Sequence, residues 1–314
     1  MTDTATAENT QRQFKKDDAD SYDAVVDHFD RYTERYTSHL PLPLINQAKV
    51  SADGLILDVG TGTGIIALEV AKKLHNNGKV VGIDLSDGML ATANAKAESR
   101  GLTNKVDFLK MDAEKLQFPD NHFNAALSLY ALRHFPNPSA SVEEILRVLK
   151  PGAHFVAAVG SAPTLFSLSG FHAATRRVAS IVRKSLGKEL SACDFIDGLV
   201  NKYLPEMKDR EEAEWVEHHH GFTGSIKTLL KEAGFNSVRT SWKGQYSMVK
   251  TAEDFWLLQM TFSSIARKRV QQSEKNQVDA LKEEFFARAN EVLNKRGRLV
   301  YQTGAAIVVG VKPS

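Results

Sequence analysis

The sequence predicts an α/β protein with a doubly wound, mostly parallel β-sheet, and two observations support this prediction. Short apolar segments that end in polar residues alternate with segments of helical spacing between residues 55 and 159. The first apolar segment leads directly into a turn that holds three glycines in five residues. Strands that alternate with helices at this spacing are typical of βαβ units, in which the strands run parallel.

We expect seven strands in this sheet. Most of them are short and apolar, and several of the first five are closed by a polar residue. The expected strands lie at 55–59, Lys79–Asp84, Val106–Met111, Phe123–Leu129, His154–Val159, Asn236–Trp242 and Ala305–Val311. Ligands of such sheets bind at the carboxyl ends of the strands, so we expect the functional site at this edge.

The turn after the first strand is poor in side chains. Its glycines are Gly60, Gly62 and Gly64, and the residues that follow have helical spacing. Glycine accepts positive φ and lets a ligand approach the backbone closely, while the first turn of a helix presents free N–H groups. We therefore expect this unit to hold a nucleoside-bearing cofactor rather than to be a simple tight connection.

Polar residues at the ends of the expected strands are candidates to contact that cofactor. They are Asp58, Asp84, Asp112 and Ser128. Asp84 follows the glycine turn by about 20 residues, the distance expected for a carboxylate that binds ribose hydroxyls. Capping of the next helix is an alternative role for Asp84, but Ser86 and Asp87 are better placed for it.

The region from about Leu55 to Val159 resembles the class I S-adenosylmethionine-dependent methyltransferases. LDVGTGTG resembles their first motif, VVGIDLSDGML their acidic second motif, FLKMDAEKLQFPDNHFNAALS their adenine-binding stretch and fourth strand, and EEILRVLKPGAHF the signature after it. The resemblance implies S-adenosylmethionine as the cofactor. The cofactor-binding residues that it implies are Asp58, Gly60, Thr61, Gly62, Gly64, Asp84, Leu85, Met89, Asp112, Ala113 and Ser128.

The glycine spacing by itself leaves other functions open. Residues 62–67 (GTGIIA) also fit the GxGxxA pattern of dinucleotide-binding proteins. A nicotinamide enzyme does not account for the Asp112-Ala113 stretch or for RVLKPG. An NAD(P)-dependent oxidoreductase is therefore a less favoured alternative, and a non-catalytic S-adenosylmethionine-binding partner of another enzyme is a second one.

Within the methyltransferases, the nearest resemblance is to the ubiquinone/menaquinone C-methyltransferases and related small-molecule methyltransferases. Residues 130–138 (YALRHFPNP) resemble the Gly-Leu-Arg-Asn segment of the quinone enzymes, with Leu132 and Arg133 shared and His134 in place of Asn. The Asn/Asp-Pro-Pro-aromatic motif of enzymes that methylate nucleic-acid amines is absent. We expect C- or O-methylation of a small, largely apolar acceptor of phenol, quinone-like or natural-product type.

Two residues just beyond the fourth expected strand are the candidate catalytic groups. Methylation of a phenol, or of a ring carbon beside a hydroxyl, requires removal of a proton, and a neutral histidine is the usual base. We assign this role to His134, with His172 and residues 218–220 as alternatives, and expect Arg133 to stabilise a phenolate. The run 218–220 has no further ligand at a suitable spacing, so we assign no metal site.

The composition fits a cytoplasmic enzyme. The formal net charge of +2 implies no strong attraction to nucleic acid. Cys193 is the only cysteine, which excludes an intrachain disulfide and fits a reducing compartment. No apolar run reaches the roughly 18 residues of a membrane span, and the N-terminus has no signal or transit peptide pattern. We expect no stable membrane insertion, and the oligomeric state is left open.

Four regions make up the expected domain organisation. They are a disordered leader (1–20), a cofactor-binding core with N-terminal lid helices (21–160), a helical insertion that caps the substrate (161–222), and the end of the core sheet (223–314) with a helical insertion at 252–296. Lid candidates are Phe29, Tyr32 and Tyr36. Candidates for an apolar substrate pocket are Phe166, Phe171, His172, Phe195, Trp242, Tyr246, Phe255 and Trp256. The basic clusters 176–177, 183–184 and 267–269 are expected on solvated helix faces, and attraction of an acidic substrate or an anionic membrane surface is the less favoured alternative.

Overall fold

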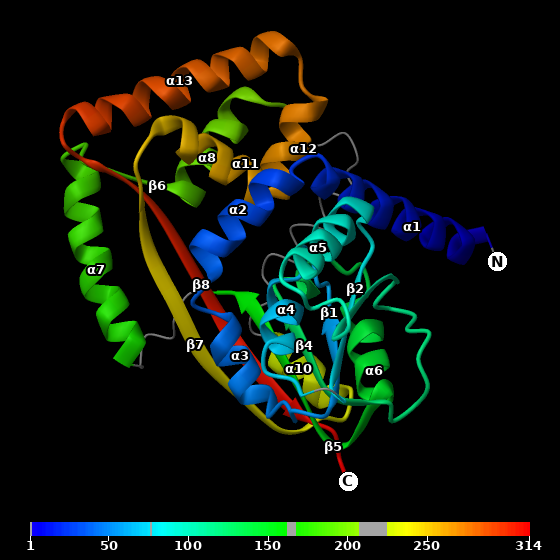
Figure 1. Ribbon diagram of the computed structural model, residues 1–314. Coiled ribbons are helices and arrows are strands. Elements are labelled where there is room, and N and C mark those ends of the chain that lie inside the picture. The colour runs from blue at the N-terminus through cyan, green and yellow to red at the C-terminus, as the bar shows by residue number, and fades with distance from the viewer. Residues whose placement is uncertain (1, 76, 162–167, 207–224) are drawn as a thin grey trace.

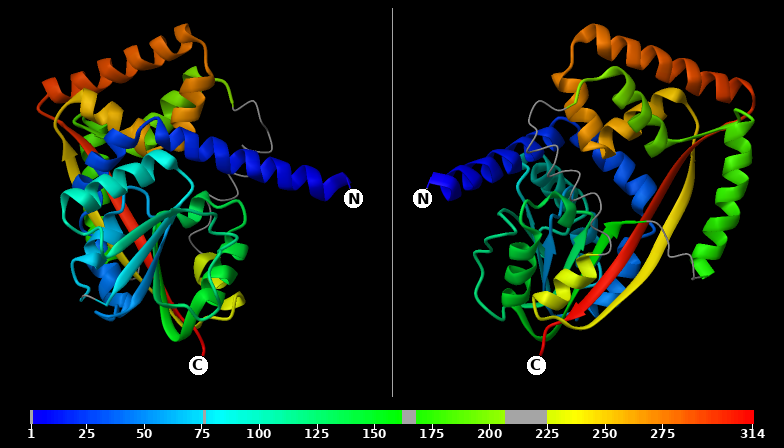
Figure 2. Two further views of the ribbon diagram at one scale, coloured as in Figure 1. Left: turned by 45° about the vertical axis from the view of Figure 1, so that its right-hand side comes forward. Right: turned by 180° about the vertical axis from the view of Figure 1, so that it is seen from behind.

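The computed structural model describes residues 2–75, 77–161, 168–206 and 225–314 (Figure 1). A central β-sheet carries helices on both faces, and further helices lie across the end of the sheet where its parallel strands terminate (Figures 1 and 2). None of the helices in these ranges is both long and apolar enough to cross a membrane. The predicted fold class, a doubly wound and mostly parallel sheet with helices, is confirmed.

The sheet contains eight strands among the described residues. They are β1 (Leu55–Val59), β2 (Lys79–Asp84), β3 (Val106–Lys110), β4 (Phe123–Leu129), β5 (Leu149–Gly160), β6 (Glu189–Ser191), β7 (Asn236–Val249) and β8 (Arg298–Val311). Their order is β3-β2-β1-β4-β5-β8-β6, and β7 pairs with β8. Strands β1 to β5 are parallel, while β8 is antiparallel to β5 and β7. The chain direction across the sheet reverses between β1 and β4, the position where ligands of such sheets bind.

Helices cover both faces of the sheet because its central strands are apolar on both sides, as in parallel sheets generally. Every residue of β1 after Leu55 is buried. One face packs against α3 (Pro41–Ala48) and α4 (Ile65–Ala71), and the other against α6 (Pro138–Val148) and α10 (Ser225–Glu232). The helix α5 (Asp87–Ser99) follows β2, and the short η1 (Leu132–His134) follows β4.

A cap of helices lies beyond the carboxyl ends of the parallel strands. It consists of α2 (Val26–Thr37), α8 (Ala192–Tyr203), α11 (Ala252–Phe262), α12 (Ser264–Gln272) and α13 (Lys275–Asn294), which share an apolar core. Phe195, Phe255 and Trp256 all pack on Phe285 inside this core. These three aromatic residues, which we expected in a substrate pocket, thus stabilise the cap.

The expected strands agree with the structure at the centre of the sheet and differ at its edge. The bounds of β4 are as predicted, whereas β5 begins at Leu149, five residues earlier than predicted. Strands β7 and β8 are each 14 residues long, twice the predicted length. They pair with each other as far as Val249 and Leu299, well past the end of β5. Cross-strand hydrogen bonds hold this extension, in which β7 is mostly exposed or half-buried while Leu299 and Val300 of β8 are buried, and the extension carries the cap (Figure 1).

The N-terminal segment differs from the expected disordered leader. The helix α1 spans Thr2–Asp23, and α7 (Leu168–Ser185) is the other long helix outside the core and cap. Few apolar residues occur in α1, which is why its composition predicts disorder. It is held instead by charged side chains from Lys15 to Asp23, whose partners lie at the carboxyl ends of the sheet strands. Phe166 and residues 218–220 lie outside the described residues, as do the side chains of Phe171 and His172.

Candidate active site

The loop between β1 and α4 has the conformation that its glycines predict. Gly60, Gly62 and Gly64 have φ values of 67°, 54° and 80°. A Cβ at Gly60 would lie 2.1 Å from the Cβ of Ala131, and one at Gly64 would lie 3.0 Å from a ring of β3, so packing requires both glycines. A Cβ at Gly62 would meet nothing nearer than Phe29, at 3.7 Å. Gly62 is therefore the open tip of the loop.

Asp58 lies beneath this loop and is 1% exposed. Its Oδ2 accepts hydrogen bonds from Oγ1 of Thr61 at 2.7 Å and from the N–H of Ala67 at 3.1 Å. Burial raises the pKa of Asp58 to about 7, although both hydrogen bonds act in the opposite direction. Ser128 is also buried and donates to the carbonyl of Val59 at 2.9 Å. The side chains of Asp58, Thr61 and Ser128 thus shape the loop from below.

Asp84 closes β2 directly beside the loop tip. Its Oδ2 accepts from the N–H of Gly62 at 2.8 Å, and its Oδ1 accepts from the N–H of Ser86 at 3.0 Å. Each oxygen retains a further lone pair, so the carboxylate can also accept hydrogen bonds from a diol. Burial raises the pKa of Asp84. Ser86 caps α5 as predicted, by accepting from the N–H of Met89 at 3.0 Å, while Met89 itself is buried and Leu85 is half-buried.

Asp112 and Ala113 follow β3 at the same edge of the sheet. Oδ2 of Asp112 accepts from Nζ of Lys15 at 2.7 Å, and the same ammonium group bonds Glu114 at 2.6 Å. Oδ1 of Asp112 accepts from the N–H of Glu114 at 2.9 Å, and Ala113 is buried. Asp112, the acidic residue predicted to lie at the adenine, is therefore linked to α1 by an ion pair.

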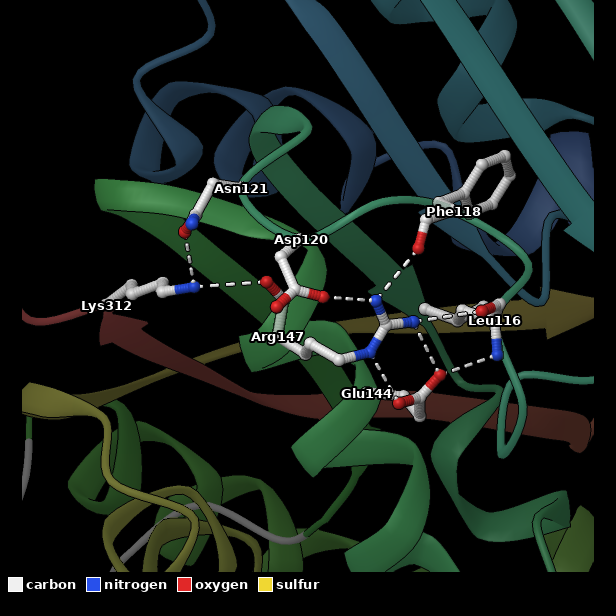
Figure 3. Close-up of polar contacts among 7 residues, drawn as sticks. All are labelled: Leu116, Phe118, Asp120, Asn121, Glu144, Arg147 and Lys312. Atoms are coloured by element: carbon white, nitrogen blue, oxygen red, sulfur yellow. Dashed lines mark hydrogen bonds and ion pairs between the residues drawn. The ribbon is translucent and has the colours of Figure 1, made fainter.

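Arg147, from the RVLKPG segment, anchors the loop that continues from Asp112 (Figure 3). Its guanidinium donates to the carbonyls of Leu116 at 2.9 Å and Phe118 at 2.8 Å. It also pairs with Asp120 at 2.7 Å and with Glu144 at 2.8 Å. Glu144 in turn accepts from the N–H of Leu116 at 2.8 Å. This network stabilises one side of the candidate cofactor site from outside it.

The helix α1 crosses the carboxyl edge above these loops (Figures 1 and 2). Oδ1 of Asp23 accepts from Oγ of Ser86 and, at 3.0 Å, from the N–H of Gly88. The Tyr22 ring meets Phe29 edge to face, with 5.5 Å between centroids. Because Phe29 is also the side chain that a Cβ at the loop tip would meet, it fits the predicted lid role. Tyr32 and Tyr36, the other lid candidates, are buried in the cap core.

His134 is held between two side chains of α1. Its Nδ1 lies 3.1 Å from Oδ2 of Asp18, and its Nε2 lies 3.3 Å from the Tyr22 hydroxyl. Burial raises the pKa of Asp18, but the neighbouring His134, Lys268 and Arg267 outweigh it and hold this pKa below its usual value. Burial raises the pKa of Tyr22, so its hydroxyl stays protonated and donates. A ring proton on Nδ1 is directed at the Asp18 carboxylate, and in that tautomer Nε2 is the hydrogen-bond acceptor that faces the Tyr22 hydroxyl.

Two cations of α12 complete this polar cluster. Arg267 donates to Oγ of Ser21 at 3.0 Å and lies 4.8 Å from the centroid of the Tyr22 ring. Nζ of Lys268 lies 3.8 Å from Oδ1 of Asp18. The triplet 267–269, expected on a solvated face, is instead buried because each residue meets acids or carbonyl oxygens inside the protein.

Arg133 and Tyr130 lie on the same connection after β4. Nη1 of Arg133 is 3.5 Å from the carbonyl of Gly160 at the end of β5, and burial lowers the pKa of Arg133. Tyr130 has a φ of 62°, which is rare for an aromatic residue and is held by the bond from its N–H to Ala158 at 2.8 Å. Backbone strain of this kind clusters at functional sites. Sequence patterns do not report it, so Tyr130 was not among the predicted residues.

The residues gathered at this edge fit a nucleoside-bearing cofactor. Asp84 and Asp112 are carboxylates at the ends of neighbouring strands, and the open loop tip lies beside the first of them. In the part of the chain that the structure describes, Oγ1 of Thr63 and Oδ1 of Asp58 are buried polar atoms of this loop without a hydrogen-bond partner. Fold, loop and acids together define a class I methyltransferase.

Comparisons with known proteins agree with this class. Residues 56–152 match a family model described as a methyltransferase domain. The ubiquinone/menaquinone biosynthesis C-methyltransferase UbiE of Pseudomonas putida is 35% identical over 197 residues, which cover 62% of this chain and 70% of that protein. A demethylmenaquinone methyltransferase of Bacteroides fragilis is 32% identical over 196 residues, 62% of this chain and 73% of that protein.

Structural similarity extends over most of the chain. The crystal structure of a protein from Bacillus halodurans aligns with a TM-score of 0.51 at 20% identity, covering 88% of this chain and 100% of the other, which shows a shared fold. The chain belongs to the ubiquinone/menaquinone C-methyltransferase family of class I S-adenosylmethionine-dependent methyltransferases. The predicted family, enzyme class and cofactor are thereby confirmed.

Proposed function

We propose that the enzyme transfers the methyl group of S-adenosylmethionine to a small, largely apolar acceptor with a hydroxyl at or beside the methylated atom, as in phenols and reduced quinones. One observation carries this proposal: beyond the end of β4, Nδ1 of His134 lies 3.1 Å from the Asp18 carboxylate, and Nε2 on the opposite side of the ring lies 3.3 Å from the Tyr22 hydroxyl. This arrangement suits the removal of a hydroxyl proton. Methylation then takes place on the oxygen or on the adjacent ring carbon.

The cofactor is held by groups from three loops in this proposal. The glycine loop lies against its methionine part, Asp84 accepts from the ribose hydroxyls, and Asp112 and Ala113 lie at the adenine. When bound, S-adenosylmethionine supplies an already activated methyl group. The chain then has to position the acceptor and exclude water, and α1 is placed above both sites to do so.

His134 acts as the base. The Tyr22 hydroxyl now bonds its Nε2 at 3.3 Å, and the acceptor hydroxyl takes over this position. When Nε2 takes the proton, the ring becomes a cation, which the Asp18 carboxylate stabilises across 3.1 Å. A base of this kind contributes about 10²–10⁴-fold to the rate. Arg133 is the candidate to stabilise the phenolate through charge-assisted hydrogen bonds.

Aromatic side chains support an apolar acceptor. A series of ring contacts leads from His134 into the cap: Tyr22 meets Phe29, Phe29 meets Phe262 at 5.7 Å, and Phe262 stacks on Tyr301 at 5.7 Å. Planar aromatic molecules pack well against such rings. The relatives described above include enzymes named for ubiquinone, menaquinone and demethylmenaquinone, which are ring compounds of this kind.

The cellular setting is part of the proposal. The single Cys193 and the mixed, near-neutral charge support an enzyme of the cytoplasm that acts on small molecules. The formal net charge of +2 supports an acceptor other than nucleic acid.

The test is methyl transfer from labelled S-adenosylmethionine to a panel of phenols, reduced naphthoquinones and amines. We expect label in the phenols or quinols, and the wild-type rate lowered about 10²–10⁴-fold in His134→Ala. Affinity for S-adenosylhomocysteine should barely change in this variant. His134→Asn introduces the asparagine that the quinone enzymes have at this position. It tests whether an amide side chain supports methyl transfer without a histidine base. Label in amines only, or an unchanged rate in His134→Ala, would contradict the proposal.

A further inference from the structure

A cavity of about 450 Å³ lies between the helix α7 and the strands β7 and β8, and its wall is basic. Arg176 and Arg183 of α7 and Arg298 of β8 line it, and within the described ranges no acidic side chain does. The sequences of α7, β7 and β8 contain no Asp or Glu. Pockets that hold small molecules typically have volumes of about 300–1,000 Å³, so the cavity is large enough for such a ligand.

One acid lies behind this wall. The side chain of Glu189 is fully buried and accepts from Nε of Arg183 at 2.6 Å and from Nε of Arg298 at 3.1 Å. Oγ of Ser180 donates to it as well. A single carboxylate neutralises only one of these two guanidinium groups, and Arg176 has no acidic partner in the part of the chain that the structure describes. The cavity therefore retains two uncompensated positive charges.

The donors that face the cavity are held in place. Because a buried carboxylate that lost its partners would be strongly destabilising, Glu189 fixes the positions of Arg183 and Arg298. The side chains of these arginines are 30% and 32% exposed, so their remaining N–H groups are accessible to a ligand. Tyr246 of β7 also lines the cavity, and its buried hydroxyl lies near Glu189 and Arg183 without a well-aligned hydrogen bond to a described residue. Burial raises the pKa of Tyr246, so the hydroxyl is protonated and is a further donor.

We propose that this cavity binds a small molecule through a phosphate monoester group. Such a group carries a charge of about −2 at neutral pH, which matches the two uncompensated positive charges. Guanidinium groups bind phosphate oxygens in pairs, with two parallel hydrogen bonds. A phosphodiester or a single carboxylate would leave one positive charge uncompensated.

The proposed site is separate from the candidate active site. Figures 1 and 2 show α7 beside the extended β7, with α1 and α5 on the other side of the molecule. The inference therefore goes beyond the proposed methyl transfer and does not depend on the identity of the methyl acceptor.

Calorimetry tests the proposal with the full chain, saturated with S-adenosylhomocysteine so that the cofactor site is occupied. The probe is glycerol 3-phosphate, and we expect saturable binding that weakens as salt is added. Dimethyl phosphate, which carries one charge, should bind about tenfold more weakly or not at all. Arg176→Gln should weaken binding of glycerol 3-phosphate about tenfold, and it leaves the ion pairs of Glu189 intact. Tyr246→Phe, which removes only the hydroxyl, should weaken it about threefold.

Arg239→Gln is the matched control, because Arg239 is an exposed arginine of β7 that does not line the cavity. It should bind glycerol 3-phosphate like the wild type. Sedimentation with phosphatidic acid vesicles presents the same monoester on a lipid surface. The proposal is overturned by binding to these vesicles without binding of glycerol 3-phosphate, by no binding to either, by equal affinity for dimethyl phosphate, or by equal losses in Arg176→Gln and Arg239→Gln.

Discussion

Asp18→Asn removes the negative charge beside His134 while it keeps the size of the side chain. In the wild type the carboxylate lies 3.1 Å from Nδ1 of His134 and 3.8 Å from Nζ of Lys268, and its side chain is 10% exposed. If His134 takes a proton during the reaction, the negative charge of Asp18 stabilises the transition state more than the ground state. The substitution should therefore lower kcat.

The magnitude follows from the contact. A hydrogen bond to a charged group contributes about 1.5–3 kcal/mol, and each 1.36 kcal/mol corresponds to about tenfold in rate. Asp18→Asn should therefore reduce kcat about 10- to 150-fold. Cofactor affinity should change by less than about twofold, because no cofactor-binding candidate contacts Asp18 in the described structure and the lost interaction acts on the transition state.

Steady-state methyl transfer gives kcat, and calorimetry with S-adenosylhomocysteine gives the affinity. Asp17→Asn is the control, because Asp17 is the adjacent exposed acid of α1, and within the described ranges its side chain bonds only Gln13, at 2.7 Å. It should behave like the wild type in both measurements. A loss of less than about threefold in Asp18→Asn, or a parallel loss of cofactor affinity, would refute the reasoning and assign Asp18 to the attachment of α1.

Four further substitutions test the cofactor site and its loop. Asp84→Ala should weaken S-adenosylhomocysteine binding about tenfold or more, and unchanged affinity by calorimetry would exclude the ribose role. Gly60→Ala should destabilise the protein by about 3 kcal/mol or more, because its Cβ would lie 2.1 Å from that of Ala131 at a φ of 67°. Gly62→Ala, whose Cβ would lie in ordinary van der Waals contact 3.7 Å from Phe29, should cost only about 1 kcal/mol. Urea titration measures the free energy of unfolding of both variants. For Asp58, the folded-state pKa of about 7 lies above its usual 3.8, so its contribution to stability is full below about pH 4 and is lost as the pH rises towards 7. Asp58→Asn should lack this loss, and equal pH dependence of the two unfolding free energies would show that Asp58 does not titrate in this range.

The sheet and the glycine loop could be predicted because local sequence determines them. Strands β1, β2 and β4 are largely buried apolar runs, and a positive φ at Gly60 or Gly64 leaves glycine as the fitting residue. Capping of α5 by Ser86 is local in the same way, since donor and acceptor are three residues apart. Such features can therefore be predicted without knowing which residues far away in the sequence lie beside them.

The docked helix α1 could not be predicted because its contacts are polar and distant in sequence. Lys15 meets Asp112, and Asp18 meets His134, without any apolar face on α1 that periodicity would reveal. The extension of β7 was missed for a related reason. Most of its side chains are exposed or half-buried, so the strand lacks the alternation that marks a half-buried strand.

The position of α1 also determines when the enzyme becomes complete during folding. Its partners Asp112 and Arg267 lie 97 and 246 residues further along the chain from Lys15 and Ser21. Polar helices gain little stability on their own, and contacts of such long separation form late. The sheet can therefore fold while α1 is still undocked. His134 acquires Asp18 only when α1 docks, so a chain with a finished sheet but an undocked α1 has the cofactor loops without the paired base.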